Sequence, residues 1–205
     1  MALAAKLPPP LAAPKNLTTA SKFTPSDDYS FMKLKLLFTS LLVSTTSLLA
    51  ALPKAGDPAP LFSGQDQDGQ AFKLADLVGR KFVLLYFYPK DFTGGCTREA
   101  CGFRDRMGEL QTNNVAVVGV SRDTVANHKK FAAEYQLNFT LVADPDGKII
   151  ATYDAKLPLV SLSKRVSFLI GLDGKIIHVT NTMNPQTHFD EMKAALAGIK
   201  ARQLK

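Results

Sequence analysis

The stretch Tyr86-Phe-Tyr-Pro-Lys-Asp-Phe-Thr-Gly-Gly-Cys-Thr-Arg-Glu-Ala-Cys-Gly-Phe-Arg-Asp105 decides how this chain is interpreted. It overlaps an apolar, aromatic-rich run over residues 82–88, which Pro89 ends. A continuous apolar run of this length is typical of a buried central strand. A helix is expected over residues 97–110, so Cys96 stands where a buried strand has ended and a helix is about to begin.

The position of Cys96 favours reactivity over a structural use. Unpaired backbone N–H groups and the positive end of the helix dipole favour a thiolate over a thiol at the start of a helix. Gly94 and Gly95 just before it would let backbone amides point at a small bound oxygen species. A nucleophile needs such activation, whereas a buried structural cysteine does not.

The chain contains two cysteines, Cys96 and Cys101, five positions apart. Two cysteines cannot fill a four-cysteine zinc site, and closing so short a loop would stabilise a fold little. We therefore interpret the pair as catalytic or redox-active, and expect neither a metal nor a cofactor.

The remaining pattern predicts an α/β domain. A second buried strand is expected over residues 115–120, and turns at residues 144–147 and at 173–174. Further elements are expected as follows: a helix over 125–135, a hairpin of strands 166–170 and 175–179, and a final helix over 185–199. This order predicts a thioredoxin-like three-layer fold, in which helices flank a central mixed sheet.

Residues 1–52 are interpreted as a targeting region, and residues 53–205 as the folded domain. Residues 1–31 are rich in Ala, Pro, Ser and Thr, and residues 36–52 form an uncharged run of 17 residues that follows two lysines. Six of these 17 are Ser or Thr, and a bilayer span needs about 20 mainly apolar residues. A secretory signal fits better than a retained membrane anchor.

Residues 1–31 and the segment that begins at Met32 form two basic-then-apolar signals in series. Together they predict a chloroplast transit peptide followed by a thylakoid-lumen signal. The alternative is a bacterial or cyanobacterial exported protein whose true start is Met32. No Arg-Arg pair marks the twin-arginine route. In both cases we expect removal near residues 50–54 and no stable membrane insertion afterwards.

The formal net charge of the 205-residue chain is +7, and charged residues make up 21% of it. No basic cluster with interleaved aromatic residues follows residue 52, which argues against a nucleic-acid partner. The hydrophobic share of 46% is sufficient for a buried core.

The active-site stretch resembles that of the peroxiredoxins. Pro89, Thr93 and Cys96 fit the Pro-x-x-x-Thr-x-x-Cys pattern of that family, and the spacing of Cys96 and Cys101 resembles its peroxiredoxin Q, or bacterioferritin comigratory protein, branch. The likeness extends over residues 56–199. Gly94 departs from the pattern, since proline is usual there, and this should loosen the loop by roughly 1 kcal/mol.

The resemblance implies a thiol-dependent peroxidase that reduces hydrogen peroxide and organic hydroperoxides. Cys96 would be the nucleophile and pass through a sulfenic acid, and Cys101 would resolve it as a disulfide that thioredoxin or a similar dithiol reduces. Arg165 falls where the family has its active-site arginine and would hold the sulfur ionised. Thr93 would orient the peroxide oxygens and Pro89 would shield the thiolate. We expect a monomer.

Helical geometry adds a dynamic expectation. Five residues of α-helix rise about 7.5 Å and leave the two cysteine Cα atoms roughly 8 to 9 Å apart. Disulfides rarely form beyond about 7 Å. The helix that carries Cys96 and Cys101 should therefore unwind in each catalytic cycle.

Two other functions are alternatives for such a cysteine pair. An exported thioredoxin-like copper chaperone also pairs two cysteines with a distant histidine, but with three residues between the thiols rather than four, and Arg165 would repel the ion. A disulfide oxidoreductase would have two residues between its thiols. The three histidines, His128, His178 and His188, are interpreted as surface or helix-packing residues rather than ligands, and Tyr86, Phe87 and Tyr88 as core aromatics.

Overall fold

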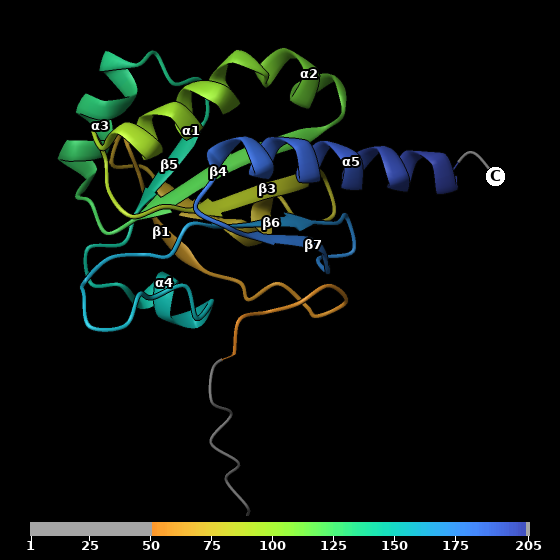
Figure 1. The fold of residues 1–205 in the computed structure, drawn as a ribbon, viewed down its shortest axis with the longest axis horizontal. Helices are drawn as coiled ribbons and strands as arrows, with labels where there is room; N and C mark the ends of the chain where they lie inside the picture. The colour runs from red at the N-terminus through yellow and green to blue at the C-terminus, as the bar shows by residue number, and fades with distance from the viewer. Residues whose placement is uncertain (1–50, 204–205) are drawn as a thin grey trace, which may run out of the picture. The chain divides into compact units, whose positions relative to one another are not determined.

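The computed structural model describes residues 51–203, which belong to one compact unit built on a seven-stranded sheet (Figure 1). The strand order is β2-β1-β5-β4-β3-β6-β7. The strands are β1 Ser63–Asp66, β2 Ala71–Lys73, β3 Phe82–Phe87, β4 Val115–Ser121, β5 Thr140–Ala143, β6 Val166–Ile170 and β7 Ile176–Asn181. The helices are the 3-10 helix η1 Leu74–Asp76 and the α-helices α1 Gly94–Asp105, α2 Met107–Thr112, α3 Val125–Glu134, α4 Lys148–Thr152 and α5 Pro185–Gln203.

The sheet is mixed, as expected. Strand β4 runs parallel to β3 and β5, while β6 pairs antiparallel with β3 and with β7. At the other edge, β1 pairs antiparallel with both β5 and β2. The central place of β3 explains its apolar sequence, because all six of its residues are buried.

The core lies on both faces of the sheet. Leu84 and Tyr86 point to the face covered by α1, α2, α3 and α5, and Val83 and Leu85 to the face covered by α4 (Figure 1). This alternation follows from the two-residue period of a strand. The predicted three-layer, thioredoxin-like fold is confirmed.

The predicted elements agree with the structure to within a few residues, with two differences. The helix expected over 97–110 begins at Gly94 and divides at Arg106 into α1 and α2. Glycines are poor helix formers, so the sequence pattern alone places residues 94 and 95 in the preceding loop. The strands β1, β2 and β5 and the helix α4 were not predicted.

The predicted targeting region lies almost wholly outside the described residues. At its end, Leu52 packs against the core cluster on the α4 side of the sheet, and Pro53 is buried. The stretch from residue 51 to residue 203 contains no helix with both the length and the apolar character to cross a membrane.

Candidate active site

Cys96 occupies the first turn of α1, the helix that follows the central strand β3. Thr93 is the N-cap residue with extended backbone, and Cys96 is the third helical residue. Its side chain is buried, with 1% of the residue exposed. The backbone N–H groups of such a first turn have no partner within the helix and favour negative charge. The chain thus presents a buried sulfur at an electropositive helix end.

Arg165 contacts this sulfur from its position directly before β6. It precedes β6, which pairs with β3, and its Nη2 donates a hydrogen bond to Cys96 Sγ at 3.3 Å. Arg165 is itself 4% exposed. A Cβ atom at Gly95 would lie 3.1 Å from Nη2, so the absence of a side chain there allows the guanidinium to approach the start of α1.

Glu99 is the second partner of Arg165. It lies one turn after Cys96, is fully buried, and accepts a hydrogen bond from Arg165 Nη1. Burial raises the pKa of Glu99 to about 7, although the charge of Arg165 opposes this shift. Burial by itself would lower the pKa of Arg165, but the charge of Glu99 and the contacts with Cys96 raise it. The guanidinium is therefore the cation shared by a carboxyl and a thiol.

His188 extends the cluster into α5. Its Nε2 donates to the carbonyl oxygen of Thr182 at 2.9 Å, and its Nδ1 accepts from Ser167 Oγ at 2.7 Å. Nδ1 also lies 3.8 Å from Glu99 Oε1. Burial lowers the pKa of His188, which keeps the imidazole neutral. A continuous line of contacts thus joins α5 to the Cys96 sulfur through Glu99 and Arg165.

The loop between β3 and α1 is anchored by Asp91. This buried carboxylate accepts from Tyr88 Oη at 2.7 Å and contacts His128 Nδ1 at 2.8 Å. The Asp91 backbone N–H donates to Asp123 Oδ2 at 2.9 Å, and Ser121 Oγ donates to the same oxygen at 2.7 Å. Side chains from the ends of β3 and β4 and from α3 therefore hold the loop that leads to Cys96.

Phe92 gives this loop an unusual backbone. Its φ angle is +61°, a left-handed conformation that bulky residues rarely adopt. Phe92 is 44% exposed, and its ring centroid lies 5.1 Å from that of Phe131 and 6.3 Å from that of Tyr135. Such conformations persist where the surroundings impose them, and they occur often at functional sites.

Thr93 and Pro89 complete the predicted site residues. Thr93 is exposed, and its hydroxyl donates to the carbonyl oxygen of Lys90 at 3.0 Å. Pro89 is half-buried directly after β3. Both belong to the loop that precedes Cys96, so the residues of the Pro-x-x-x-Thr-x-x-Cys pattern come from one strand–loop–helix unit.

Cys101 lies on the same helix as Cys96 and is not bonded to it. Both thiols are free, Cys96 buried and Cys101 partly exposed. Cys101 lines an open groove of about 480 Å³ together with Arg98, Arg106 and residues at the start of α5. Helix α1 runs unbroken through both cysteine positions.

Three buried groups around Cys96 were not singled out from the sequence: Glu99, Asp91 and His188. The interpretation of the histidines was incomplete, because His128 and His188 are both fully buried in polar networks. Tyr88 likewise does more than pack, since its hydroxyl contacts Asp91. The three-residue spacing of Cys96 and Glu99, which puts them on one helix face, was the available signal for Glu99.

Comparison with known proteins agrees with this geometry. The model of the AhpC/TSA family matches residues 55–179. Peroxiredoxin Bcp of Escherichia coli (strain K12) is 43% identical over 143 residues, which cover 67% of this chain and 91% of that protein. This chain belongs to the AhpC/TSA family of peroxiredoxins. It is a thiol-dependent peroxidase. Membership of this family argues against the two alternative functions, a copper chaperone and a disulfide oxidoreductase.

Two further relatives place the chain near the predicted branch of these peroxiredoxins. Peroxiredoxin Q, chloroplastic, of Oryza sativa subsp. japonica is 36% identical over 138 residues, covering 66% of this chain and 63% of that protein. The crystal structure of peroxidoxin BcpB from Mycobacterium tuberculosis superposes with a TM-score of 0.68 at 34% identity, covering 72% of this peroxiredoxin and 98% of that chain.

The described part of this peroxiredoxin contains no group of three or more His, Cys, Asp or Glu side chains that could hold a metal ion. The sulfur of Cys96 instead faces a guanidinium.

Proposed function

We propose that Cys96 is the peroxidatic nucleophile and that Cys101 resolves it. The observation that carries this proposal is the 3.3 Å hydrogen bond from Arg165 Nη2 to the buried Cys96 sulfur at the first turn of α1. A cation and a helix N-terminus both favour the thiolate, which is the form that attacks peroxide.

In the first step the Cys96 thiolate attacks one peroxide oxygen and the O–O bond breaks. The attacked oxygen stays on sulfur as a sulfenic acid, and the other leaves as hydroxide or alkoxide and takes up a proton. Arg165 would polarise the peroxide, and the Thr93 hydroxyl with the Gly95 and Cys96 amides would orient its oxygens. Pro89 would shield the thiolate from bulk water.

In the second step the Cys101 thiol attacks the Cys96 sulfenic acid, which releases water and forms the disulfide. Thioredoxin or a similar dithiol would then reduce the disulfide and regenerate both thiols. Because both cysteines lie on the intact helix α1, this step requires part of α1 to unwind.

Single cysteine variants test the division of labour. Cys96→Ser should not reduce peroxide at all, whereas Cys101→Ser should react once and then accumulate sulfenic or sulfinic acid at Cys96. Intact mass before and after one equivalent of peroxide distinguishes these products. Substantial turnover by Cys96→Ser with thioredoxin would contradict the assignment.

We also propose that the protein acts as a monomer in a chloroplast, in the thylakoid lumen. The name of the rice relative supports a chloroplast, while the bacterial relatives keep export from a bacterium as the alternative. The packing of Leu52 and the burial of Pro53 favour a mature N-terminus at residues 50–52. Mass analysis of the purified protein would locate it, and a membrane fraction that retains residues 33–52 would contradict this placement.

A further inference from the structure

The first turn of α5 contacts a stripe of four residues along α1 and its C-cap. His188 lies beside Glu99, and the ring of Phe189 packs against Gly102 and Phe103 and beneath Arg106. Three residues of α1 and its C-cap residue Arg106 are spaced as i, i+3, i+4 and i+7, which is the stripe that one helix presents to another. This stripe covers the part of α1 that follows Cys96.

Phe189 makes the greater part of this contact. Its ring centroid lies 4.7 Å from that of Phe103, with the rings at 81°, and the guanidinium carbon of Arg106 lies 4.5 Å above it. A Cβ atom at Gly102 would overlap the ring. The residue is 8% exposed. Edge-to-face pairs and cation–π contacts of this kind add to the stabilisation from burial alone.

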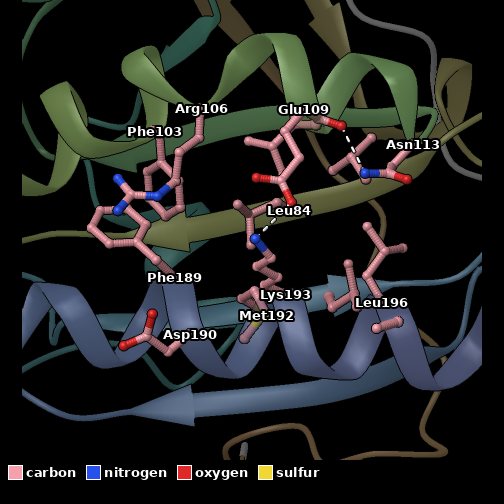
Figure 2. Close-up of a pocket in the computed structure, with 14 residues that line it drawn as sticks. Leu84, Phe103, Arg106, Glu109, Asn113, Phe189, Asp190, Met192, Lys193 and Leu196 are labelled. Atoms are coloured by element: carbon pink, nitrogen blue, oxygen red, sulfur yellow. Dashed lines mark hydrogen bonds and ion pairs between the residues drawn. The ribbon is translucent and has the colours of Figure 1, made fainter.

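Phe189 also lies at one end of a cavity of about 340 Å³ between α2 and α5 (Figure 2). Figure 2 shows it beside Phe103 and Arg106, while Leu196 lies at the opposite end of the cavity, near Asn113. Cys96 does not line this cavity. The packing that joins α5 to the Cys101 half of α1 is therefore concentrated at Phe189 and is separate from the reacting sulfur.

We propose that Phe189 is a positioning residue that holds α1 folded and thereby sets how fast Cys101 reaches the Cys96 sulfenic acid. The inference rests on the proposed disulfide between these two cysteines. While α1 stays folded, the sulfenic acid remains beside Arg165 and can meet a second peroxide, which would oxidise it to sulfinic acid. When Phe189 lets α1 open, Cys101 forms the disulfide first. The strength of one aromatic contact thus determines the balance between turnover and overoxidation.

The test separates the two chemical steps by rapid mixing with peroxide, alkylation and intact mass. In Phe189→Ala and the milder Phe189→Leu, we expect disulfide formation to be faster, by about tenfold for alanine, because a lost core contact favours local opening. The first step should stay close to the wild-type rate, and sulfinic acid should appear only at higher peroxide concentrations.

Leu196→Ala is the matched control, because it removes a buried α5 side chain at the far end of the same cavity. It should lower the melting temperature and leave the rate of disulfide formation unchanged. Equal acceleration in Leu196→Ala and Phe189→Ala, or none in either Phe189 variant, would overturn the inference. A wild-type protein that forms no Cys96–Cys101 disulfide would instead refute the proposed function.

A double-mutant cycle tests the contact itself. With Phe189 present, Gly102→Ala should speed disulfide formation because the new methyl group overlaps the ring. In the Phe189→Ala background the overlap is gone and alanine is the better helix former, so Gly102→Ala should slow disulfide formation. The same effect of Gly102→Ala in both backgrounds would contradict the role of Phe189.

Discussion

The Nη2 atom of Arg165 lies 3.3 Å from the Sγ atom of Cys96, although 69 residues separate the two in the chain. The pairing of β3 with β6 brings them together, because Cys96 follows β3 and Arg165 precedes the antiparallel strand beside it. The same guanidinium binds Glu99. One buried cation therefore serves two acidic groups, and the reactivity of Cys96 should depend on both partners.

Arg165→Ala should slow the first reaction with peroxide. Removing a charge-assisted contact from a dry site costs on the order of 1.5 to 3 kcal/mol, which corresponds to about 10- to 150-fold in rate. Stopped-flow kinetics with equimolar peroxide would measure it. Arg104→Ala is the control, since Arg104 forms a partly exposed ion pair with Asp105. An unchanged rate in a folded Arg165→Ala protein would contradict the assignment.

Glu99→Gln should change how stability depends on pH. Burial raises the pKa of Glu99 to about 7, so between about pH 4.3 and 7 the folded protein holds a proton that the unfolded chain releases. The resulting stabilisation is complete below this window and is lost as the pH rises through it. The free energy of unfolding should therefore fall less from pH 5 to pH 8 in Glu99→Gln than in the wild type.

Urea unfolding of the reduced proteins at the two pH values would measure this difference. Other titrating groups are common to both proteins, so the comparison isolates Glu99. Identical slopes in the two proteins would show that Glu99 titrates as an ordinary carboxyl group.

Asp91→Ala should destabilise the domain and slow the peroxidase reaction together. It leaves Tyr88 Oη and His128 Nδ1, both buried, without their carboxylate partner. Breaking a buried pair in this way costs about 3 to 5 kcal/mol. Asp105→Ala, which removes an exposed carboxylate, should stay within about 0.5 kcal/mol of the wild type. Thermal unfolding and peroxide kinetics would show whether Asp91 anchors the loop.

Gly94→Pro should raise stability. Gly94 is the first residue of α1, where proline is favoured, and the extended backbone of Thr93 suits a following proline. Space around Gly94 is open, so we expect a gain of about 0.4 to 1 kcal/mol. Gly198→Pro, inside α5 and beyond its first turn, should instead cost about 3 kcal/mol. A lower melting temperature for Gly94→Pro would mean that the backbone at residue 94 does not suit proline.

An element could be predicted from the sequence where the pattern that indicates it lies within one short stretch of the chain. The strand β3 and the helix start at Cys96 lie in one continuous stretch, so hydrophobic pattern and turn residues were sufficient to predict them. The strands β1 and β2 have four and three residues with no buried position, and such short, partly exposed strands carry little periodicity.

The missed site residues depend on tertiary contacts. Nothing in the sequence around Arg165 marks it as a partner of Cys96, and only the family resemblance pointed to it. Asp91 and His188 are functional candidates because distant strands and helices bury them beside polar partners. Burial of this kind arises from long-range packing and leaves no short-range pattern.

Hydrogen exchange on the two redox forms should show α1 opening on oxidation. In the reduced protein the helix is continuous from Gly94 to Asp105, and its amides over residues 97–103 should be protected. A disulfide between cysteines five residues apart cannot close across an intact α-helix. The disulfide form should lose protection over these residues, while the buried central strands β3 and β4 keep theirs.

The control for this experiment is Cys101→Ser treated with one equivalent of peroxide. It should form the Cys96 sulfenic acid but no intramolecular disulfide, and α1 should stay protected. Loss of protection in this variant would assign the opening to oxidation of Cys96 itself. Mass analysis would first verify the Cys96–Cys101 disulfide. If residues 97–103 then stay as protected as in the reduced protein, the helical hydrogen bonds coexist with the disulfide. That result would contradict the unwinding of α1.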